Sequence, residues 1–319
     1  MSLVGNTAAQ GAFAAAAAGG TLHHAWLIAG PEGVGKGSFA RQAGAELVGG
    51  GLHRDEMIAA RAHPDFKLVE REHWAKPDQL VPYDERKEGE PPARSIRVAQ
   101  IRWLRTALTV RPSMGERRAV IIDAVDDLEP GGANALLKSL EEPPPGTIFL
   151  LVSHAPGRLL PTIRSRCRLL RFGALDDAEM AIALRQADPT LDADELAALV
   201  AAGEGSPGRA LRLAGLDVKG LDAAIAAIAA DGDPDNARRS ALARALTGKA
   251  AQPRYEAFLD RVPAYIAHQA RRRSGPALAR TLDAHARARD AAGAALGLSL
   301  DPQATVWEMA GLLAELPRS

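Results

Sequence analysis

The stretch AWLIAGPEGVGKGSFARQAGAEL, residues 25–47, joins a short apolar run, a glycine-rich turn and a helical pattern without a break. The apolar run predicts a buried strand, and the pattern from about Ser38 to Leu47 predicts a helix. Between them, GPEGVGKGS (residues 30–38) matches the form GxxxxGK[ST] of a phosphate-binding loop, except that Gly37 stands where serine or threonine is expected. The stretch therefore predicts a strand, a phosphate-binding loop and a helix.

The chemistry of such a loop assigns a role to each position. Glycines let the backbone curl so that its N–H groups face phosphate oxygens, and the start of the helix adds partial positive charge. Lys36 would reach the outer phosphates, whereas Gly37 lacks the hydroxyl that normally ligates Mg²⁺. Ser38 lies about 100° further around the helix, so its hydroxyl points elsewhere. The predicted nucleotide-binding residues of the loop are Gly30, Gly33, Gly35, Lys36, Gly37 and Ser38.

A carboxylate that could complete this site ends a four-residue apolar run. The segment RRAVIIDAVDDL (residues 117–128) has four apolar residues before Asp123, which is typical of a central parallel strand. An aspartate at such a strand end, paired with an upstream phosphate-binding loop, can hold Mg²⁺ through water. We therefore predict Asp123 as a nucleotide-site residue, with Mg²⁺ present only if nucleotide binds.

Strand and helix patterns alternate up to Phe172 and indicate a parallel α/β sheet. The segments that carry this alternation are DFKLVE (65–70), VAQIRWLRTAL (98–108), RRAVIIDAVDDL (117–128), NALLKSLEE (134–142), TIFLLVS (147–153) and RLLRF (168–172). The polar stretch between His73 and Arg94 predicts an exposed loop or insertion. After Phe172 only helical patterns follow. We predict an α/β domain over 1–172, a small helical lid over 173–216 and an all-α domain over 217–319.

Composition narrows the class of protein. The chain has 39 Lys and Arg residues and 39 Asp and Glu residues, so its net charge is zero. This charge does not indicate that the whole chain attracts nucleic acid electrostatically. The basic patches at residues 237–246 and 270–275 are interpreted as solvated helix faces. The single cysteine, Cys167, excludes an internal disulfide and a multi-cysteine zinc site. We expect no zinc, no membrane contact and a cytoplasmic location.

The stretch NALLKSLEEPPPGTIFLLVSHAPGRLLPTIRSRC, residues 134–167, is the most specific in the chain. It resembles the clamp-loader branch of the AAA+ ATPases, whose pattern runs through a leucine- and glutamate-rich helix, two prolines, a strand and a final serine-arginine-cysteine. The motifs HPD (63–65) and GSPGRAL (205–211) add to the resemblance, which covers roughly residues 20–215. It implies a P-loop NTPase core with a helical lid and a helical collar domain.

The resemblance implies a role for Arg166. In this family the arginine of the serine-arginine-cysteine motif reaches into the ATP site of a neighbouring subunit. A guanidinium supplied in this way stabilises the charge that accumulates on the transferred phosphoryl group. Arg166 is therefore the predicted catalytic residue, acting in trans. Cys167 is interpreted as a small buried residue rather than as a nucleophile or a metal ligand.

The same resemblance implies that the chain's own site does not hydrolyse ATP. Three parts that hydrolysing relatives carry are missing: the metal-binding hydroxyl at Gly37, a water-orienting glutamate at Ala124 and a lid arginine at Gly208. Each contributes several kcal/mol to phosphoryl transfer in enzymes of this type. Weak binding of ATP or ADP remains open, because Lys36, the glycines and Asp123 are kept.

The implied partners are those of a replication machine. They are gamma/tau-type ATPase subunits and a delta subunit, with the sliding clamp and primed DNA reached through the assembly that serves the DNA polymerase. An ATP-hydrolysing motor subunit of the same machine is the alternative, and it would need Ser38 or an aspartate after Ala124 to take over the missing roles. A free-standing kinase for small molecules is a more distant alternative, because the arginine motif and the helical end of the chain imply an oligomer.

Overall fold

A computed structural model describes residues 3–49, 53–71, 74–76, 79–80, 93–298 and 300–316. Its residues divide into two compact units. The N-terminal unit comprises Met1–Asp192 and Gly203–Arg209, and the C-terminal unit comprises Ala193–Ala202 and Ala210–Ser319. The boundary runs through the segment predicted as a lid, and the three-domain division stays a prediction.

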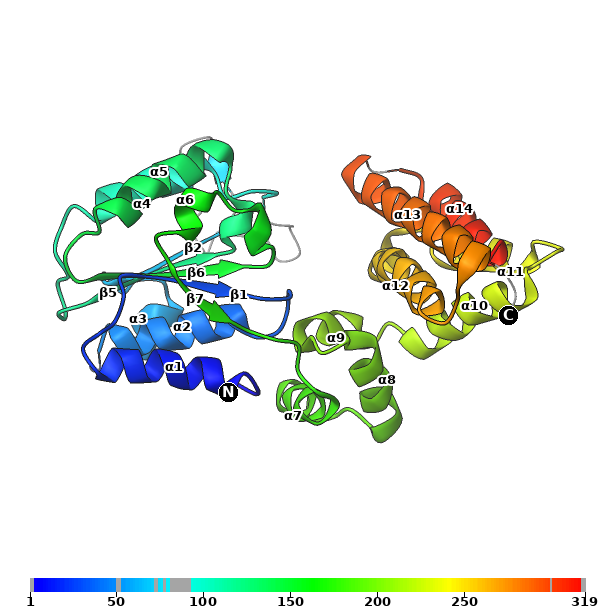
Figure 1. Cartoon of the computed structure of the whole chain (residues 1–319), viewed down its shortest axis with the longest axis horizontal. Helices are drawn as coiled ribbons and strands as arrows, with labels where there is room; N and C mark the ends of the chain where they lie inside the picture. Colours follow the sequence, from blue (N-terminus) through cyan, green and yellow to red (C-terminus); the bar gives the residue numbers. More distant parts are fainter. Residues whose placement is uncertain are drawn as a thin grey trace. The chain divides into compact units, whose positions relative to one another are not determined.

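A parallel sheet forms the centre of the N-terminal unit (Figure 1), and its described strands follow the order β2-β5-β6-β1-β7. They are β1 (Ala25–Ala29), β2 (Phe66–Glu70), β5 (Arg118–Asp123), β6 (Thr147–Ser153) and β7 (Arg168–Arg171). Strands β3 (Trp74–Lys76) and β4 (Gln79–Leu80) form a separate antiparallel pair. Every residue of β1 and β6 is buried, as continuous apolar runs in a parallel sheet require.

Helices cover both faces of this sheet (Figure 1). On one face lie α1 (Thr7–Ala18), α2 (Lys36–Leu47) and α3 (Arg54–Ala59); on the other lie α4 (Val98–Ala107), α5 (Pro130–Glu141) and α6 (Pro161–Arg164). Short 3₁₀ turns occur at η2 (Val125–Asp127) and η3 (Pro156–Arg158). The apolar residues Ile101 and Leu104 of α4, Leu108 directly after it, and Leu136 and Leu140 of α5 are buried against the sheet, and Leu137 is partly buried there.

Asp65 and Arg118 form a buried ion pair at the entrance to β2 and β5. The Asp65 carboxylate lies 3.3 Å from Arg118 Nη2 and accepts backbone N–H groups of Ser113 and Met114 at 2.8 and 2.7 Å. The Arg118 guanidinium donates to the carbonyls of Ala107, Val110 and Arg111. The pair therefore ties the loop between α4 and β5 to the sheet, which gives the aspartate of the HPD motif a structural role.

Three short helices follow the sheet: α7 (Asp177–Ala187), α8 (Ala193–Gly203) and α9 (Pro207–Leu213). Asp176 caps α7, because its carboxylate accepts the N–H of Glu179 and the Glu179 side chain returns a bond to the N–H of Asp176. The start of α9 belongs to the N-terminal unit and its remainder to the C-terminal unit.

The main helices of the C-terminal unit are α10 (Val218–Asp231), α11 (Ala237–Ala245), α12 (Gln252–Ala270), α13 (Gly275–Leu298) and α14 (Pro302–Ala314), with the 3₁₀ turn η4 (Lys249–Ala251) before α12. Helix α14 packs against α10, α11, α12 and α13. The core of this bundle buries Leu221, Ile225, Ile228, Phe258, Val262, Ile266, Val306, Met309 and Leu313.

We expect Asp233→Ala to lower the free energy of unfolding of the C-terminal unit by about 3 kcal/mol. The Asp233 side chain is 1% exposed and accepts the backbone N–H groups of Arg238 and Arg239 at 3.0 Å and Arg239 Nε at 3.1 Å. The substitution removes the cap of α11 and leaves the Arg239 guanidinium without this carboxylate. Urea denaturation followed by circular dichroism measures the loss. Asp231→Ala, at an exposed ion pair with Arg238, is the control and should cost less than about 1 kcal/mol.

The predicted order of a parallel α/β core followed by helices alone is confirmed for the described part of the chain. The predicted polar loop between His73 and Arg94 lies almost wholly outside the described residues. Among the helices that are described, none combines the length and apolar character needed to cross a membrane.

Candidate functional site

The predicted phosphate-binding loop lies between the end of β1 and the start of α2. Gly33 and Gly35 have φ angles of 77° and 92°, a backbone region that glycine enters freely. The side chain of Leu3 packs over the turn, since a Cβ on Gly35 would lie 2.7 Å from Leu3 Cδ1. The loop therefore has the predicted strand–turn–helix setting, and part of the chain's own N-terminal segment covers it.

Lys36 is folded back onto the loop that carries it. Its side chain is 2% exposed, and Nζ donates to the carbonyl oxygens of Gly30, at 2.7 Å, and Pro31. Burial lowers the pKa of Lys36 to about 8. Nearby carboxylates oppose this shift, and Asp123 has the largest opposing effect. A phosphate would have to draw the ammonium group away from these two carbonyls.

The beginning of α9 packs directly on the loop. The N–H of Gly208 donates to the Gly33 carbonyl at 2.9 Å, and Ser206 Oγ donates to the Glu32 carbonyl at 2.8 Å. A Cβ on Gly33 would lie 2.3 Å from Ser206 Oγ, so this close approach requires glycine. Gly208 itself brings no cation to the loop, and the next residue, Arg209, pairs with Glu204 at 2.8 Å.

Gly37 faces the carboxylate of Asp123 across the start of α2. A Cβ placed on Gly37 would lie 2.3 Å from Asp123 Oδ2. The same oxygen accepts Arg41 Nη1 at 3.0 Å, and Arg41 stands four residues after Gly37, one turn along the same face of α2. Asp123 thus lies at the predicted site, but a guanidinium from the chain itself neutralises it.

The acids after Asp123 hold other parts of the chain. Asp126 accepts Ser153 Oγ at 2.9 Å and the backbone N–H groups of His154 and Ala155 at 2.6 and 3.2 Å. Asp127 pairs with Arg71 at 3.2 Å, and burial raises the pKa of its carboxyl group. The hydroxyl of Ser153 is therefore used to fix the end of β6, and Asp126 is committed to the same contact.

Arg166 lies just after α6 and is held at two points. Its Nη2 lies 2.7 Å from Glu141 Oε1, and its Nη1 donates to the Thr162 carbonyl at 2.9 Å. The side chain is 33% exposed. Glu141 ends α5, so the ion pair joins the two halves of the motif that stretches from residue 134 to 167. A guanidinium has five N–H donors, which leaves others for an incoming anion.

The phosphate-binding loop and Arg166 lie at opposite ends of two neighbouring strands, β1 and β7. The loop follows the last residue of β1, whereas Arg166 comes before the first residue of β7, and these strands run parallel with Trp26 beside Arg168 and Ala29 beside Arg171. Strands of this length separate their ends by roughly 13–17 Å. Arg166 therefore lies at the other end of these strands from the phosphate-binding loop of its own chain.

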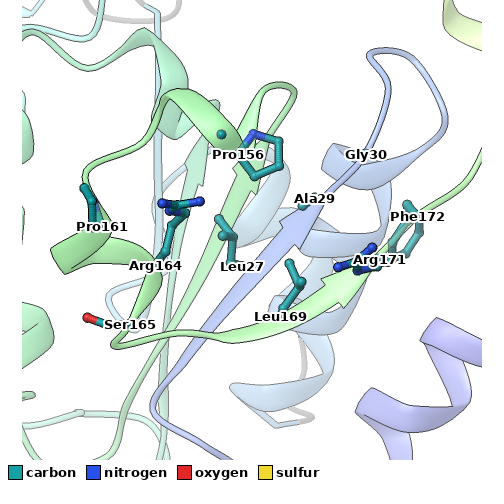
Figure 2. A pocket seen from close by; sticks show the side chains of 11 residues that line it. Leu27, Ala29, Gly30, Pro156, Pro161, Arg164, Ser165, Leu169, Arg171 and Phe172 are labelled. Atoms are coloured by element: carbon teal, nitrogen blue, oxygen red, sulfur yellow. The ribbon is translucent and has the colours of Figure 1, made fainter.

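A cavity of about 650 Å³ lies over β1 and β7. Figure 2 shows the side chains of Arg164 and Arg171 at its two ends, with Leu27 and Leu169 between them. Its full lining is Leu27, Ala29, Gly30, Pro156, Gly157, Pro161, Arg164, Ser165, Leu169, Arg171 and Phe172. Cys167, two residues after Ser165 of this lining, is half-buried. Burial raises the pKa of its thiol to about 12, so the thiol is not ionised to a thiolate at neutral pH.

The predicted site residues thus fall into two groups. Gly30, Gly33, Gly35, Lys36 and Gly37 lie together at the loop, Asp123 lies against Gly37, and Ser38 is exposed on α2. Arg166 stands apart at the other end of strands β1 and β7.

Sequence reasoning missed the side chains that partner the two key residues, Arg41 and Glu141. The spacing of four residues between Gly37 and Arg41 places both on one face of the helix and could have indicated Arg41 as a partner of Asp123. Nothing local to Glu141 pointed to Arg166, which is 25 positions away.

The sequence is similar to subunits of DNA polymerase III. A sequence profile of the family described as DNA polymerase III, delta subunit, matches residues 5–176. The chain is 35% identical over 206 residues to the DNA polymerase III subunit delta-prime of Pseudomonas aeruginosa, covering 61% of this chain and 57% of that protein. It is 32% identical over 158 residues to the subunit delta-prime of Escherichia coli, covering 50% and 42% of the two chains.

The match is partial in length. The chain spans about half the length of the relatives it matches. Among solved structures, a DNA polymerase III gamma subunit-related protein of Thermotoga maritima aligns with a TM-score of 0.44 and 16% identity, over 92% of this chain and 95% of that one.

Proposed function

The chain belongs to the DNA polymerase III delta-subunit family, and from this membership we propose that it is the delta-prime subunit of a bacterial clamp loader. In this proposal the subunit does not hydrolyse ATP itself. It offers Arg166 to the ATP site of a neighbouring gamma/tau-type subunit and contacts a delta subunit within the assembly. Through that assembly it takes part in placing the sliding clamp on primed DNA.

The position of Arg166 carries this proposal. The arginine precedes β7 while the phosphate-binding loop follows the neighbouring strand β1, so the two lie at opposite ends of these strands, which favours a role for Arg166 at the phosphate of another chain. Its ion pair with Glu141 keeps the guanidinium at the surface rather than collapsed on the core, with N–H groups left for a γ-phosphate. A planar guanidinium binds phosphate oxygens through paired N–H donors. Glu141 is thus a positioning residue.

The state of the loop supports the absence of turnover. The position of the metal-binding hydroxyl is Gly37, the residue after Asp123 is Ala124, and Gly208 replaces the lid arginine. The acids that could substitute are engaged, since Asp126 holds the end of β6 and Asp127 pairs with Arg71. Nucleotide binding, if retained, is weak, because Lys36 must leave two carbonyl groups to reach a phosphate.

The alternative of an ATP-hydrolysing motor subunit finds less support. Ser38 is exposed on α2. The position that faces Asp123 is that of Gly37, because a Cβ there would lie 2.3 Å from Asp123 Oδ2. An aspartate after Ala124 would have to leave its present partners.

The proposal is tested by ATP hydrolysis with purified components. The chain alone should show no hydrolysis above background, and its addition to gamma/tau and delta subunits with sliding clamp and primed DNA should stimulate hydrolysis by the mixture. If the purified chain hydrolyses ATP and Lys36→Ala abolishes this activity, the motor-subunit function replaces the one proposed here.

A further inference from the structure

A phosphate-binding loop of the form GxxxxGK[ST] normally works with Mg²⁺, and the residues present here do not fit that ion. Mg²⁺ requires oxygen ligands at about 2.0–2.1 Å in octahedral geometry. Gly37 supplies no hydroxyl, and Asp123 Oδ2 points at the side where a Cβ of residue 37 would stand, 2.3 Å away. The described residues contain no group of three or more His, Cys, Asp or Glu side chains suited to a metal ion.

The place left by the missing hydroxyl is used by a cation from the chain. Arg41 Nη1 lies 3.0 Å from Asp123 Oδ2, and Arg41 Nη2 would lie 3.1 Å from a Cβ on Gly37. The guanidinium therefore reaches the carboxylate across the empty side of the glycine. A serine or threonine at position 37 would have to push the carboxylate out of this contact, so the glycine and the ion pair depend on each other.

The surroundings of Asp123 favour this arrangement. The Asp123 side chain is 19% exposed, and that of Arg41 is 44% exposed, so the guanidinium approaches from the solvent side. Lys36, the other cation close to Asp123, directs its ammonium group to the carbonyls of Gly30 and Pro31. Arg41 is therefore the side chain that balances the Asp123 carboxylate.

We propose that Arg41 is a built-in replacement for the divalent cation of the phosphate-binding loop, and that any polyphosphate this loop takes is bound without metal. The guanidinium supplies positive charge but cannot ligate water or polarise a phosphoryl oxygen as Mg²⁺ does. Charge balance at Asp123 is preserved while the catalytic function of the metal is lost. The proposal rests on the loop of the isolated chain and holds or fails independently of clamp-loader assembly.

The test is a Mn²⁺ titration of the full chain with 1 mM ADP present or absent, following the electron paramagnetic resonance signal of free Mn²⁺. The wild type should hold no Mn²⁺ that depends on Asp123. Arg41→Ala frees the carboxylate and should bind one Mn²⁺ at least tenfold more tightly than wild type. Gly37→Ser combined with Arg41→Ala adds a hydroxyl ligand and should bind more tightly still. Adding Asp123→Asn to Arg41→Ala should remove the gain.

Arg41→Lys keeps a cation and should behave as wild type, whereas Arg41→Gln removes the charge with less loss of packing and should behave as Arg41→Ala. Circular dichroism melting checks that each variant is folded. One Mn²⁺ bound by the wild type and lost in Asp123→Asn would overturn the proposal. So would folded Arg41→Ala and Arg41→Gln variants that bind Mn²⁺ no better than wild type.

Discussion

Replacing Arg166 by alanine is expected to lower the turnover of the neighbouring ATP site by about 10³-fold, with little change in its KM for ATP. Arginines supplied in trans to phosphoryl-transfer sites contribute about 10³–10⁵ in kcat, because they neutralise charge that grows only in the transition state. The effect is measured in a reconstituted complex whose other ATPase subunits carry a substituted loop lysine. The measured hydrolysis then comes from the ATP site that faces Arg166.

Neighbouring residues supply the controls for this prediction. Arg164→Ala removes a cation two positions away that lines the cavity over β1 and β7, and it should leave kcat within about threefold of wild type. Arg166→Lys should recover only part of the activity, because an ammonium group lacks the planar fork. Equal losses for Arg164→Ala and Arg166→Ala would point to general damage at the interface instead.

The ion pair with Glu141 gives a second, smaller test of the same role. Glu141→Gln removes the charge that holds Arg166 Nη2 at 2.7 Å, and kcat should fall by less than about tenfold because the Thr162 carbonyl still restrains the guanidinium. Glu142→Gln, at the next position, is the matched control. A loss in Glu142→Gln that equals the loss in Glu141→Gln would contradict a positioning role for the ion pair.

Asp65→Ala is expected to lower the free energy of unfolding of the N-terminal unit by about 3–5 kcal/mol. The Arg118 side chain is 3% exposed and would lose the carboxylate with which it pairs, and the N–H groups of Ser113 and Met114 would lose their acceptor. Urea denaturation of the full chain measures the change. Asp55→Ala removes an exposed aspartate that pairs with Arg54 and should cost less than about 1 kcal/mol.

The cost at Asp65 should depend on pH. Burial alone would raise the pKa of Asp65, but the N–H groups of Met114 and Ser113 together with Arg118 outweigh it and lower the pKa. A lowered pKa in the folded state means that the carboxylate stabilises the fold above its unfolded pKa of about 3.9, and that this contribution is lost as the pH falls below it. The difference between wild type and Asp65→Asn should therefore shrink between pH 5 and pH 2. A difference that stays constant over this range would contradict the ion pair.

The strands were predictable from sequence because buried parallel strands are continuous apolar runs. Residues 119–122 and 148–152 have no polar interruption that could suggest another element, and the turn between β1 and α2 is fixed by its glycines. The fold class followed from these few segments. The role of Asp65 did not follow, because its partners lie 48–53 positions further along the chain.

At the site, the sequence predicted which residues would gather but not what they would contact. Gly37 was interpreted as a lost hydroxyl, and the structure adds that a Cβ there would collide with Asp123. The ion pair between Glu141 and Arg166 was not predicted from the sequence. Long polar side chains choose partners through the tertiary fold, so local spacing gives little indication of them.

The central claim is that this chain acts on ATP through Arg166 and not through its own loop. It is tested most directly by measuring clamp-stimulated ATP hydrolysis in two reconstituted complexes, one with Lys36→Met and one with Arg166→Ala in this chain. We expect wild-type hydrolysis with Lys36→Met and a large loss with Arg166→Ala. Loss of hydrolysis with Lys36→Met and retention with Arg166→Ala would contradict it.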